Sequence, residues 1–427
     1  MSTGKTEKNV ALPSSWDIRP LGEVVQPTRP RIKPSEKPNL PFIGMENIEA
    51  HTMKLLGTVP AGTMKSSAVH FQPDDILYGR LRPYLNKVYR PEFEGLCSAE
   101  FIVFPKTESI SSRYLQYFLN SSSFASYASH LNAGDRPRVD FEQLSLYPFP
   151  VAPYEQQKCI VAEIEKQFSR LDEAVANLKR VKANLKRYKA SVLKAAVEGK
   201  FISSDSGGWI RTNLGTVLTT IEAGKSFKCE ERLPNLREIG VVKVSAVTWG
   251  TYNEEESKTC LDPDRIETRY FVKPGDFLFS RANTIQLVGA CVFAQKVTRK
   301  IMLSDKILRF HFSNRVVPQW VLYWLRSDIG RKEIQRLSTG NQESMRNIGQ
   351  DRIRQIAFAL PDLEEQHAIV AEVERRLSVI EELEAAVQAN LTRANRLRQS
   401  ILTTAFAGKL VKTNPARMMR EGVLTSK

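Results

Sequence analysis

The chain repeats itself, and this internal duplication limits its possible folds more than any single motif does. Residues 155–200 match residues 364–409 at a constant offset of 209 positions. Both segments begin with the motif Gln-x-x-Ile-Val-Ala-Glu, at Gln157 and at Gln366. Both end with a Gly-Lys pair, Gly199-Lys200 in the first and Gly408-Lys409 in the second. Because the offset is constant, this segment repeats without insertion or deletion.

The segments before each match repeat more loosely. Three pairs of stretches correspond, namely Trp16–Val24 with Trp209–Val217, Pro73–Arg80 with Pro274–Arg281, and Tyr114–Leu119 with Trp320–Leu325. Their offset rises from 193 to 201 to 206, which indicates loops of different length on one framework. The sequence therefore predicts a globular region and a long helix, followed by a second copy of both.

The two repeated segments have the apolar spacing of long helices. Neither contains proline or glycine inside it, each follows a proline, Pro153 or Pro361, and each stops at a glycine, Gly199 or Gly408. Apolar residues recur at spacings near three and four, at Ile164, Phe168, Leu171, Val175, Leu178, Leu185 and Val192, and at Val373, Leu377, Ile380, Val387, Leu391, Ala394 and Ile401. This pattern predicts a coiled-coil seam with gaps.

Charge is distributed unevenly along both helices. Each begins with acidic residues, and the second halves, such as residues 179–194, are basic. Antiparallel pairing would set each acidic half beside the other's basic half, whereas parallel pairing would place like charges together. We therefore expect an antiparallel intramolecular coiled coil and a pseudo-twofold arrangement, although charge runs are also common on solvated helix faces.

Short apolar runs alternate with turn residues in both globular regions. Six runs predict strands, at Leu40–Ile43, Asp75–Tyr78, Phe101–Phe104, Gly240–Val244, Asp276–Phe279 and Lys306–Phe310. A short helix follows in each region, near Tyr114–Leu119 and Trp320–Leu325. The predicted fold class is α/β (α+β), with globular regions at 1–153 and 201–361, long helices at 154–200 and 362–410, and a tail at 411–427.

The chain is strongly basic, with 427 residues, a formal net charge of +15 and a pI of about 9.5. This charge favours a polyanionic partner, with nucleic acid ahead of an anionic membrane surface, although a basic protein without such a partner stays open. The five cysteines have no metal-ligand spacing and are expected to be reduced thiols. No apolar run reaches the roughly 20 residues of a membrane helix, so we expect a soluble cytoplasmic protein without metal.

The turns of both globular regions carry side chains that suit DNA. Arginine and lysine bond guanine or phosphate, and asparagine and glutamine bond adenine, although each residue is also an ordinary surface residue. The candidates are Arg29, Arg31, Lys33, Arg80, Arg82, Asn86, Lys87, Arg136 and Arg138 in the first region, and Lys225, Lys228, Arg281, Asn283, Asn341, Gln342 and Arg346 in the second.

No stretch predicts catalysis. The sequence has no glycine-rich phosphate loop or nucleotide fingerprint. Asn414-Pro415-Ala416-Arg417 departs from the Asn-Pro-Pro-aromatic motif of amino methyltransferases at Ala416. Glu198-Gly199-Lys200 fits the end of a nuclease motif, but its repeat, Ala407-Gly408-Lys409, lacks the acid, so a helix-ending role explains it better. We predict a binding protein with no catalytic residue and no cofactor.

The duplicated Trp16 and Trp209 openings, the Gln-x-x-Ile-Val-Ala-Glu helix starts and the Gly-Lys helix ends, in this order, resemble the specificity subunits of Type I restriction–modification systems. The resemblance covers nearly the whole chain. It implies two target-recognition domains that each read one half of a split double-stranded DNA target. It also implies two modification subunits, which use S-adenosylmethionine to methylate adenine, and restriction subunits, which use ATP and Mg²⁺.

The resemblance leads to a hypothesis for the mechanism. The helices dock the modification subunits and hold the two recognition domains at a fixed spacing. The partner reaches its adenine by base flipping, because the reacting atom is inaccessible in a stacked duplex. Two alternatives are a coiled-coil scaffold that does not read DNA and a self-contained methyltransferase or nuclease with divergent motifs.

Overall fold

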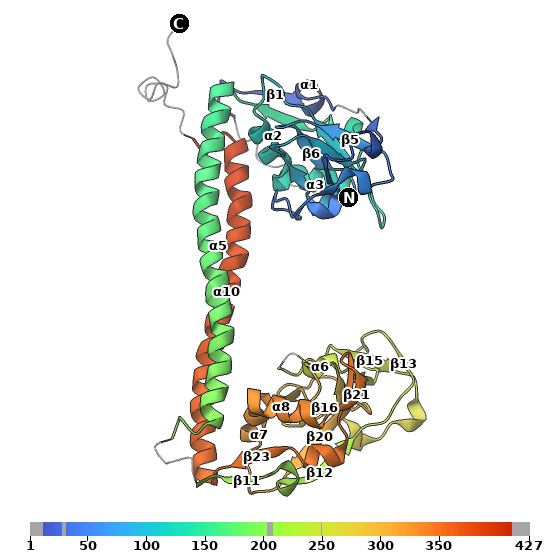
Figure 1. Cartoon of the computed structure of the whole chain (residues 1–427), viewed down its shortest axis with the longest axis vertical. Coiled ribbons are helices and arrows are strands. Elements are labelled where there is room, and N and C mark those ends of the chain that lie inside the picture. Colours follow the sequence, from blue (N-terminus) through green and yellow to red (C-terminus); the bar gives the residue numbers. More distant parts are fainter. Residues whose placement is uncertain (1–11, 28–30, 203–207, 249, 412–427) are drawn as a thin grey trace. The chain divides into compact units, whose positions relative to one another are not determined.

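A computed structural model describes residues 12–27, 31–202, 208–248 and 250–411 of the chain (Figure 1). The chain forms two compact units. The first unit comprises Met1–Lys179 with Gln388–Lys427, and the second comprises Arg180–Val387. Each unit therefore contains one globular region and a part of both long helices. The predicted tail, beyond Val411, lies outside the described residues.

The two long helices are α5 (Tyr154–Val197) and α10 (Leu363–Phe406), which Figure 1 labels. In the first unit, one small hollow is lined by Gln156, Cys159 and Ile160 of α5 together with Ala405 and Gly408. Asp172 forms an ion pair with Arg398. In the second unit, Lys189 lies 3.9 Å from Glu381. Residue numbers rise along α5 as they fall along α10, so the predicted antiparallel pairing is confirmed within the first unit.

The predicted seam is buried to different degrees. Ile164, Phe168 and Val192 of α5 are buried, whereas Leu171, Val175 and Leu178 are half-buried. On α10, the buried seam residues are Val373, Ile380, Val387, Ala394 and Ile401. The guanidinium of Arg398 lies over the ring of Phe168, so this position contributes a cation–π contact as well as an ion pair.

Both helices end at the predicted glycines. Gly199 and Gly408 each have φ 70°, which is the left-handed conformation that glycine favours at a helix end. After α5, the Gly199 N–H donates to the Ala196 carbonyl at 3.1 Å and the Lys200 N–H donates to the Ala195 carbonyl at 3.0 Å. The α10 end repeats this pair of bonds at Gly408 and Lys409. The helix-ending role of the Gly-Lys pairs is confirmed.

Replacing Gly408 by alanine is expected to destabilise the first unit. An alanine there would adopt a strained positive φ, and its Cβ would lie 2.3 Å from Cδ of Pro13. These effects together should cost about 1–2 kcal/mol, measured as a lower thermal midpoint. Gly349→Ala is the control, because Gly349 has φ −77° and open space around it. Equal effects at both positions would contradict this account of the helix end.

The described residues of the globular region in the first unit form three small sheets and four short α-helices. The sheet orders are β2-β5-β8-β3-β4, β7-β6-β9 and β1-β10. The strands are β1 Asp17–Pro20, β2 Arg31–Ile32, β3 Pro41–Ile43, β4 Val59–Pro60, β5 Ala68–Phe71, β6 Ile76–Gly79, β7 Val88–Tyr89, β8 Gly95–Ser98, β9 Phe101–Phe104 and β10 Pro148–Val151. The helices are α1 Leu21–Val24, α2 Ser112–Leu119, α3 Ser122–His130 and α4 Phe141–Leu144, of which α1 is a single turn.

The core of the first unit joins this globular region to the long helices. Tyr114 of α2 makes edge-on ring contacts with Phe149 of β10 and with Phe406 of α10. Tyr117 contacts the ring of Phe168 on α5. One hydrophobic cluster therefore contains the globular region, the start of α5 and the end of α10.

The second unit repeats this plan with longer strands around its core. Its sheet orders are β12-β20-β16-β18, β13-β15-β14-β19, β17-β22-β21 and β11-β23. The strands are β11 Ile210–Asn213, β12 Leu218–Ala223, β13 Cys229–Glu230, β14 Gly240–Val242, β15 Ser257–Cys260, β16 Phe277–Ser280, β17 Ala282–Asn283, β18 Cys291–Phe293, β19 Ile301–Met302, β20 Ile307–Phe312, β21 Thr339–Gln342, β22 Met345–Asn347 and β23 Ala357–Leu360. The helices are α6 Ser245–Thr248, α7 Pro318–Arg326, α8 Asp328–Leu337 and α9 Gln350–Arg354.

A buried glutamine fastens each long helix to its globular region. The Gln157 side chain accepts a hydrogen bond from the Ser111 N–H at 2.8 Å. It also donates to the carbonyls of Ser109 at 3.1 Å and Ala152 at 2.8 Å. Gln366 makes the same three bonds, to the Val317 N–H at 2.7 Å and to the carbonyls of Arg315 at 3.3 Å and Pro361 at 2.8 Å. This role explains why the repeated motif begins with glutamine.

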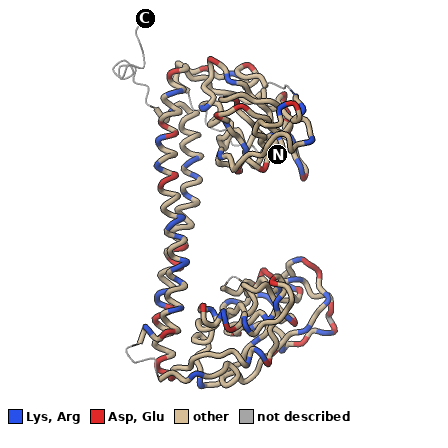
Figure 2. The backbone as a smooth tube through the Cα atoms, in the orientation of Figure 1, with Lys and Arg blue, Asp and Glu red and all other residues tan. Residues whose placement is uncertain are grey.

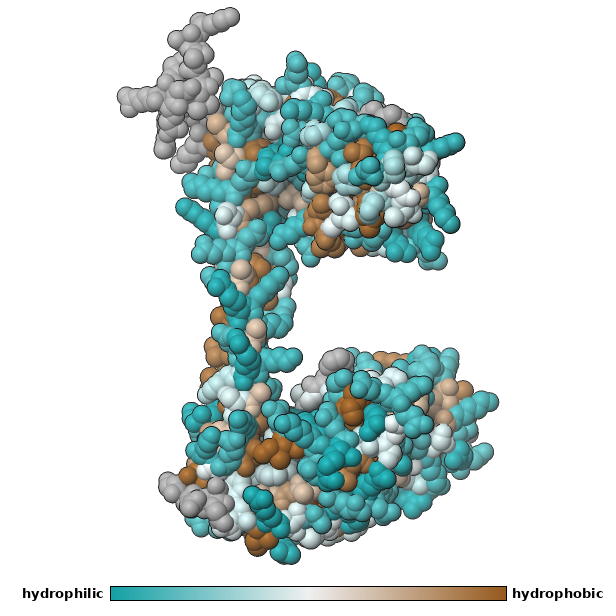
Figure 3. All heavy atoms as spheres, viewed as in Figure 1, coloured by the Kyte–Doolittle hydropathy of each residue, from teal (hydrophilic) through white to brown (hydrophobic). Residues whose placement is uncertain are grey.

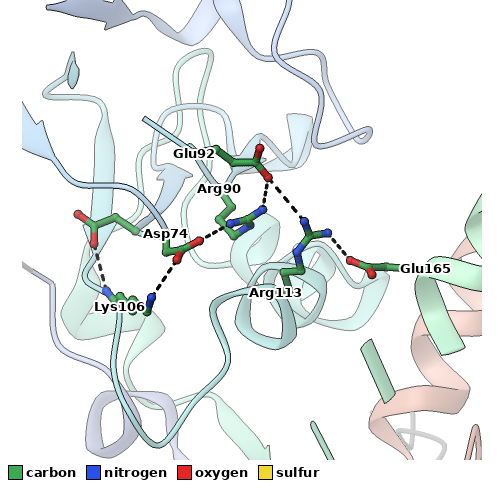
Figure 4. Close-up of polar contacts among 7 residues, drawn as sticks. Asp74, Arg90, Glu92, Lys106, Arg113 and Glu165 are labelled. Atoms are coloured by element: carbon green, nitrogen blue, oxygen red, sulfur yellow. Dashed lines mark hydrogen bonds and ion pairs between the residues drawn. The ribbon is translucent and has the colours of Figure 1, made fainter. Parts of the chain in front are cut away.

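An ion-pair network also ties the first globular region to α5 (Figure 4). Arg113 of α2 lies between Glu165 of α5 and Glu92, and pairs with both. Glu92 also pairs with Arg90 at 2.5 Å. Arg90 pairs with Asp74, and Lys106 pairs with the same carboxylate at 2.9 Å. The network thus extends from the start of β6 to the long helix.

The predicted fold class is confirmed as two sheet-rich domains joined by two long helices. All six predicted strands form, as β3, β6, β9, β14, β16 and β20, and the two predicted short helices are α2 and α7. Helices α3 and α8 and the β21–β22 hairpin were not predicted. The five predicted segment boundaries and the pseudo-twofold relation stay predictions.

Candidate nucleic-acid interface

Four predicted arginines of the first unit gather around one turn, and we call Arg80, Arg82, Arg136 and Arg138 the first loop cluster. Arg80 directly follows β6, and its carbonyl accepts the Val139 N–H at 3.1 Å. The Arg82 N–H donates to the Pro137 carbonyl at 2.7 Å. These bonds hold the turn after β6 against the loop before α4, so side chains more than 50 positions apart in sequence come together.

Two arginines of the first loop cluster are neutralised by carboxylates. Arg138 binds Glu100 with two hydrogen bonds, of 3.0 Å from Nε and 2.6 Å from Nη2. These hydrogen bonds raise the pKa of Arg138. Arg80 forms an ion pair with Asp140. Arg136 is exposed and has no hydrogen bond or ion pair with any described residue. Among these four, Arg136 is therefore the cation best placed for an external ligand.

The turn at Arg82 combines a strained backbone with buried hydrogen-bond donors that lack described partners. Arg82 has φ 52°, a left-handed conformation that is uncommon for a residue other than glycine. The Nε atoms of Arg80 and Arg82 are buried and have no hydrogen-bond partner among the described residues. Unpaired buried donors and strained backbone both cost free energy, and both are frequent at functional sites.

The structure places the other first-region candidates differently. The Asn86 side chain is 3% exposed and donates to the Asn120 carbonyl at 2.9 Å, so it stabilises this turn, and its contact with a base stays a prediction. Lys87 is half-buried and donates to the Met45 carbonyl at 2.5 Å, and burial lowers its pKa. Arg31 of β2 lines a hollow of about 70 Å³ together with Arg80. Lys33 is exposed on the next turn, and Arg29 lies outside the described residues.

Five predicted residues of the second unit gather in the corresponding place, and we call Arg281, Asn283, Asn341, Gln342 and Arg346 the second loop cluster. Arg281 follows β16 as Arg80 follows β6, and its carbonyl accepts the Ile348 N–H at 2.9 Å. The next residues form β17, which pairs with β22 so that Asn283 faces Arg346. The same turn is therefore held against a returning loop in both units.

The β21–β22 hairpin projects amide side chains. Arg346 braces this hairpin, donating to the carbonyls of Gly340 at 2.7 Å and Ser338 at 2.7 Å. Arg346 therefore stabilises the hairpin, and its contact with DNA stays a prediction. Asn341 and Gln342 are exposed near the hairpin end, and Met345 is 73% exposed. Asn341 and Gln342 thus present amide groups to solvent, whereas the exposed side chain without a described partner in the first loop cluster is that of Arg136.

Lys225 and Lys228 lie in the connection between β12 and β13 of the second unit. Lys225 pairs with Glu267 at 2.6 Å, and this hydrogen bond raises its pKa. Lys228 is exposed beside β13. Lys225 forms a parallel bridge with Ser304, whereas the Arg281 N–H donates to the carbonyl of Lys306. Lys225 and Arg281 therefore contact residues two positions apart before β20, and Lys228 is three residues further along the chain.

Sequence reasoning missed two kinds of residue in these clusters. The carboxylates Glu100 and Asp140, which hold Arg138 and Arg80, were not singled out. The Arg80 N–H donates to the Glu100 carbonyl at 2.9 Å, as the Arg281 N–H donates to the Lys306 carbonyl at 3.0 Å. Lys306 therefore takes the place of Glu100 in the second unit, where it is exposed. The loose repeat contains this correspondence, because Glu100 and Lys306 differ by the same 206 positions as Tyr114 and Trp320.

Surface charge is mixed in both globular regions. Figure 2 shows acidic residues interspersed among lysine and arginine over each region, and Figure 3 shows surfaces that are mainly hydrophilic. Within the described residues, no group of three or more His, Cys, Asp or Glu side chains is placed to hold a metal ion. No described helix is long and apolar enough to span a membrane. The basic excess is therefore spread widely, and the loop clusters are local features.

Comparison with known proteins gives consistent matches. A family model described as Type I restriction modification DNA specificity domain matches residues 13–187. The Type I restriction enzyme EcoKI specificity subunit of Escherichia coli (strain K12) is 26% identical, over 96% of this chain and 91% of the relative. The EcoEI specificity subunit of Escherichia coli is 22% identical, over 90% of this chain and 81% of the relative.

Two solved structures have the same fold. One comes from work titled as the structural basis of complex assembly and conformational transition of the type I R-M system. It matches with a TM-score of 0.74 and 21% identity, over 93% of this chain and 99% of the other. The HsdS subunit from Thermoanaerobacter tengcongensis matches with a TM-score of 0.55 and 23% identity, over 95% and 100%. The chain is thus similar over most of its length to specificity subunits of Type I restriction–modification systems, and its residues 13–187 match the model of the DNA specificity domain.

Proposed function

We propose that this chain is the sequence-specific DNA-binding subunit of a Type I restriction–modification complex, and that each globular region reads one half of a bipartite target. The observation that carries the proposal is the repeated loop cluster. In both units an arginine directly follows the same strand, and its carbonyl accepts a backbone N–H from a returning loop. Two equivalent polar loop clusters in one chain suit two half-sites in duplex DNA.

The two clusters offer different chemistry to DNA. The free guanidinium of Arg136 suits a guanine edge, and the exposed amides of Asn341 and Gln342 suit an adenine edge. The paired arginines, Arg80 and Arg138, are already neutralised, so they suit positioning more than base recognition. The two half-sites are therefore expected to differ in sequence.

The chemistry of modification and cleavage is assigned to partner subunits in this proposal. Two methyltransferase subunits with S-adenosylmethionine dock on the long helices, and restriction subunits with ATP and Mg²⁺ join them in the cytoplasm. The flipped adenine is methylated by the partner, and this chain contributes the positioning of the DNA. The family resemblance and the two related specificity subunits support this assignment.

A binding experiment distinguishes this function from its alternatives. The chain, assembled with its methyltransferase subunits, is expected to bind a target duplex far more tightly than an unrelated duplex, with affinity falling steeply as salt rises. Equal, salt-insensitive affinity for all duplexes would support a protein scaffold. Turnover of DNA by the purified chain alone, with Mg²⁺ or S-adenosylmethionine, would support a self-contained enzyme.

Replacing Arg136 by alanine is expected to relax specificity in the first half-site. The variant removes an exposed guanidinium without breaking any described hydrogen bond, so folding should be unaffected. Discrimination at one base pair should fall about ten-fold to a hundred-fold, measured by competition with single-base variants of the target. Arg336→Ala, whose guanidinium is held by Glu333 on α8, is the control. A loss confined to the second half-site would contradict the assignment.

The long helices are expected to set the distance separating the half-sites. One heptad inserted at matching levels of α5 and α10 keeps the apolar seam in register. It should lengthen the unspecified spacer of the target while both half-site sequences stay the same, measured by selection from a library of spacer lengths. A target with an unchanged spacer would contradict the ruler role.

A further inference from the structure

Two cysteines lie opposite each other in the second unit. Strand β13 pairs antiparallel with β15, and Cys229 is the register partner of Cys260. Both side chains are free thiols and both are half-buried. The other cysteines are arranged differently, because Cys97 and Cys291 are fully buried and Cys159 lies alone on α5.

The backbone hydrogen bonds define the type of this pair. The Leu261 N–H donates to the Lys228 carbonyl at 2.8 Å, so the pair next to the cysteines is hydrogen-bonded. The Cys260 N–H instead donates away from β13, to the Ile239 carbonyl at 2.9 Å. Cys229 and Cys260 are therefore a non-hydrogen-bonded pair, in which antiparallel Cα atoms lie about 4.5 Å apart. This separation lies within the range that a disulfide bridges, which is roughly 4.4–6.8 Å.

Neither sulfur atom has a strong hydrogen bond to another described residue. Phe227, Ile239 and Phe271 pack beside the cysteines on the small hydrophobic cluster of this sheet. Each sulfur has only a weak contact with a backbone carbonyl, at 3.4 Å for Cys229 and 4.0 Å for Cys260. Burial raises the pKa of Cys229, so less of its thiol is thiolate at neutral pH and its oxidation is expected to be slow.

We propose that Cys229 and Cys260 are an oxidant-responsive dithiol that closes to a cross-strand disulfide, with hydroperoxides as its oxidants. One thiolate attacks the peroxide oxygen, which gives a sulfenic acid and releases an alcohol or water. The second thiol then attacks the sulfenic sulfur, the S–S bond forms and water leaves. Two thiols are oxidised by two electrons, and one hydroperoxide is reduced. Transient disulfides of this kind are how redox sensing occurs in reducing compartments.

The disulfide would act on a turn that carries candidate DNA contacts. Strand β13 directly follows Lys225 and Lys228, and the Lys228 N–H donates to the Asp262 carboxylate at 2.5 Å. A covalent link from β13 to β15 fixes this turn against the sheet. It also closes a loop of the chain, which constrains the unfolded state and stabilises the second unit. The link does not depend on DNA reading, so it is tested separately from the proposed function.

The test treats the full chain with hydrogen peroxide, blocks residual thiols and maps the peptides by mass spectrometry. We expect the number of free thiols to fall by two per chain, a peptide pair joined through Cys229 and Cys260, and an upward shift in the thermal midpoint of the second unit. The variant Cys159→Ser should keep all three changes, whereas Cys229→Ser and Cys260→Ser should each remove them.

Two outcomes would overturn the proposal. One is oxidation of Cys229 or Cys260 to sulfinic acid in the wild-type chain without any joined peptide. The other is a joined peptide that involves Cys159 in place of either cysteine. Both are read in the wild-type protein, so they do not rely on a variant that folds.

Discussion

Arg309→Met is expected to lower the free energy of unfolding of the second unit by about 3–5 kcal/mol, because it leaves the Asp276 carboxylate, whose side chain is 13% exposed, without its cation. Arg309 lies on β20 and is 4% exposed. Its guanidinium pairs with Glu222 at 3.0 Å and with Asp276 at 2.9 Å. It also donates to the carbonyls of Arg269 at 3.1 Å and Phe271 at 2.5 Å. One side chain therefore links β12, the start of β16 and the turn before it.

The measurement for Arg309 is the thermal midpoint of the second unit in the full chain. A loss of this size corresponds to roughly 10 °C for a unit of about 200 residues. Glu222→Gln is the matched control, because Glu222 is half-exposed and the glutamine amide oxygen keeps a hydrogen-bond acceptor near Arg309. A midpoint for Arg309→Met that equals that of the control would show that the buried cation is dispensable.

The second large effect is expected at the two buried glutamines. Gln157→Ala and Gln366→Ala should each cost about 3 kcal/mol, because each removes three hydrogen bonds and leaves a buried backbone N–H without its acceptor. Gln157→Ala should affect the first unit and Gln366→Ala the second. Hydrogen exchange distinguishes the two variants. Protection should fall at the start of α5 in Gln157→Ala and at the start of α10 in Gln366→Ala.

A nearby glutamine supplies the control for these variants. Gln167 lies on α5, and its side chain donates only to Glu163, one turn earlier on the same helix. Gln167→Ala should change stability by less than about 0.5 kcal/mol. If Gln157→Ala and Gln167→Ala behaved alike, the docking role of the repeated glutamine would be refuted.

Much of the fold was predictable because the two copies of the repeat show the same helix ends and the same charge pattern. Gly199 and Gly408 recur at one offset, and each ends a helix in the left-handed conformation that favours glycine. The acidic and basic halves predicted antiparallel pairing, and the ion pair of Asp172 with Arg398 confirms it in the first unit. These features depend on local spacing and on net charge, which a sequence shows directly.

The candidate site was predictable only in part, because it depends on which loops meet. Asn86 has the residue type and the turn context of a base reader, yet its amide is buried against Asn120. Its left-handed φ of 45° is a reason for asparagine at this position that sequence alone does not reveal. Arg138 and Arg346 likewise have the chemistry of DNA contacts but bind Glu100 and backbone carbonyls.

The central claim is that one chain reads two different half-sites, and a methylation map tests it most directly. The chain would be co-expressed with its methyltransferase subunits, and methylated adenines mapped across the host genome. We predict one split motif, with two short defined halves around an unspecified gap of fixed length. Exchange of residues 1–153 for the same region of a related subunit should change only one half. A continuous motif, or a change in both halves after the exchange, would contradict the account.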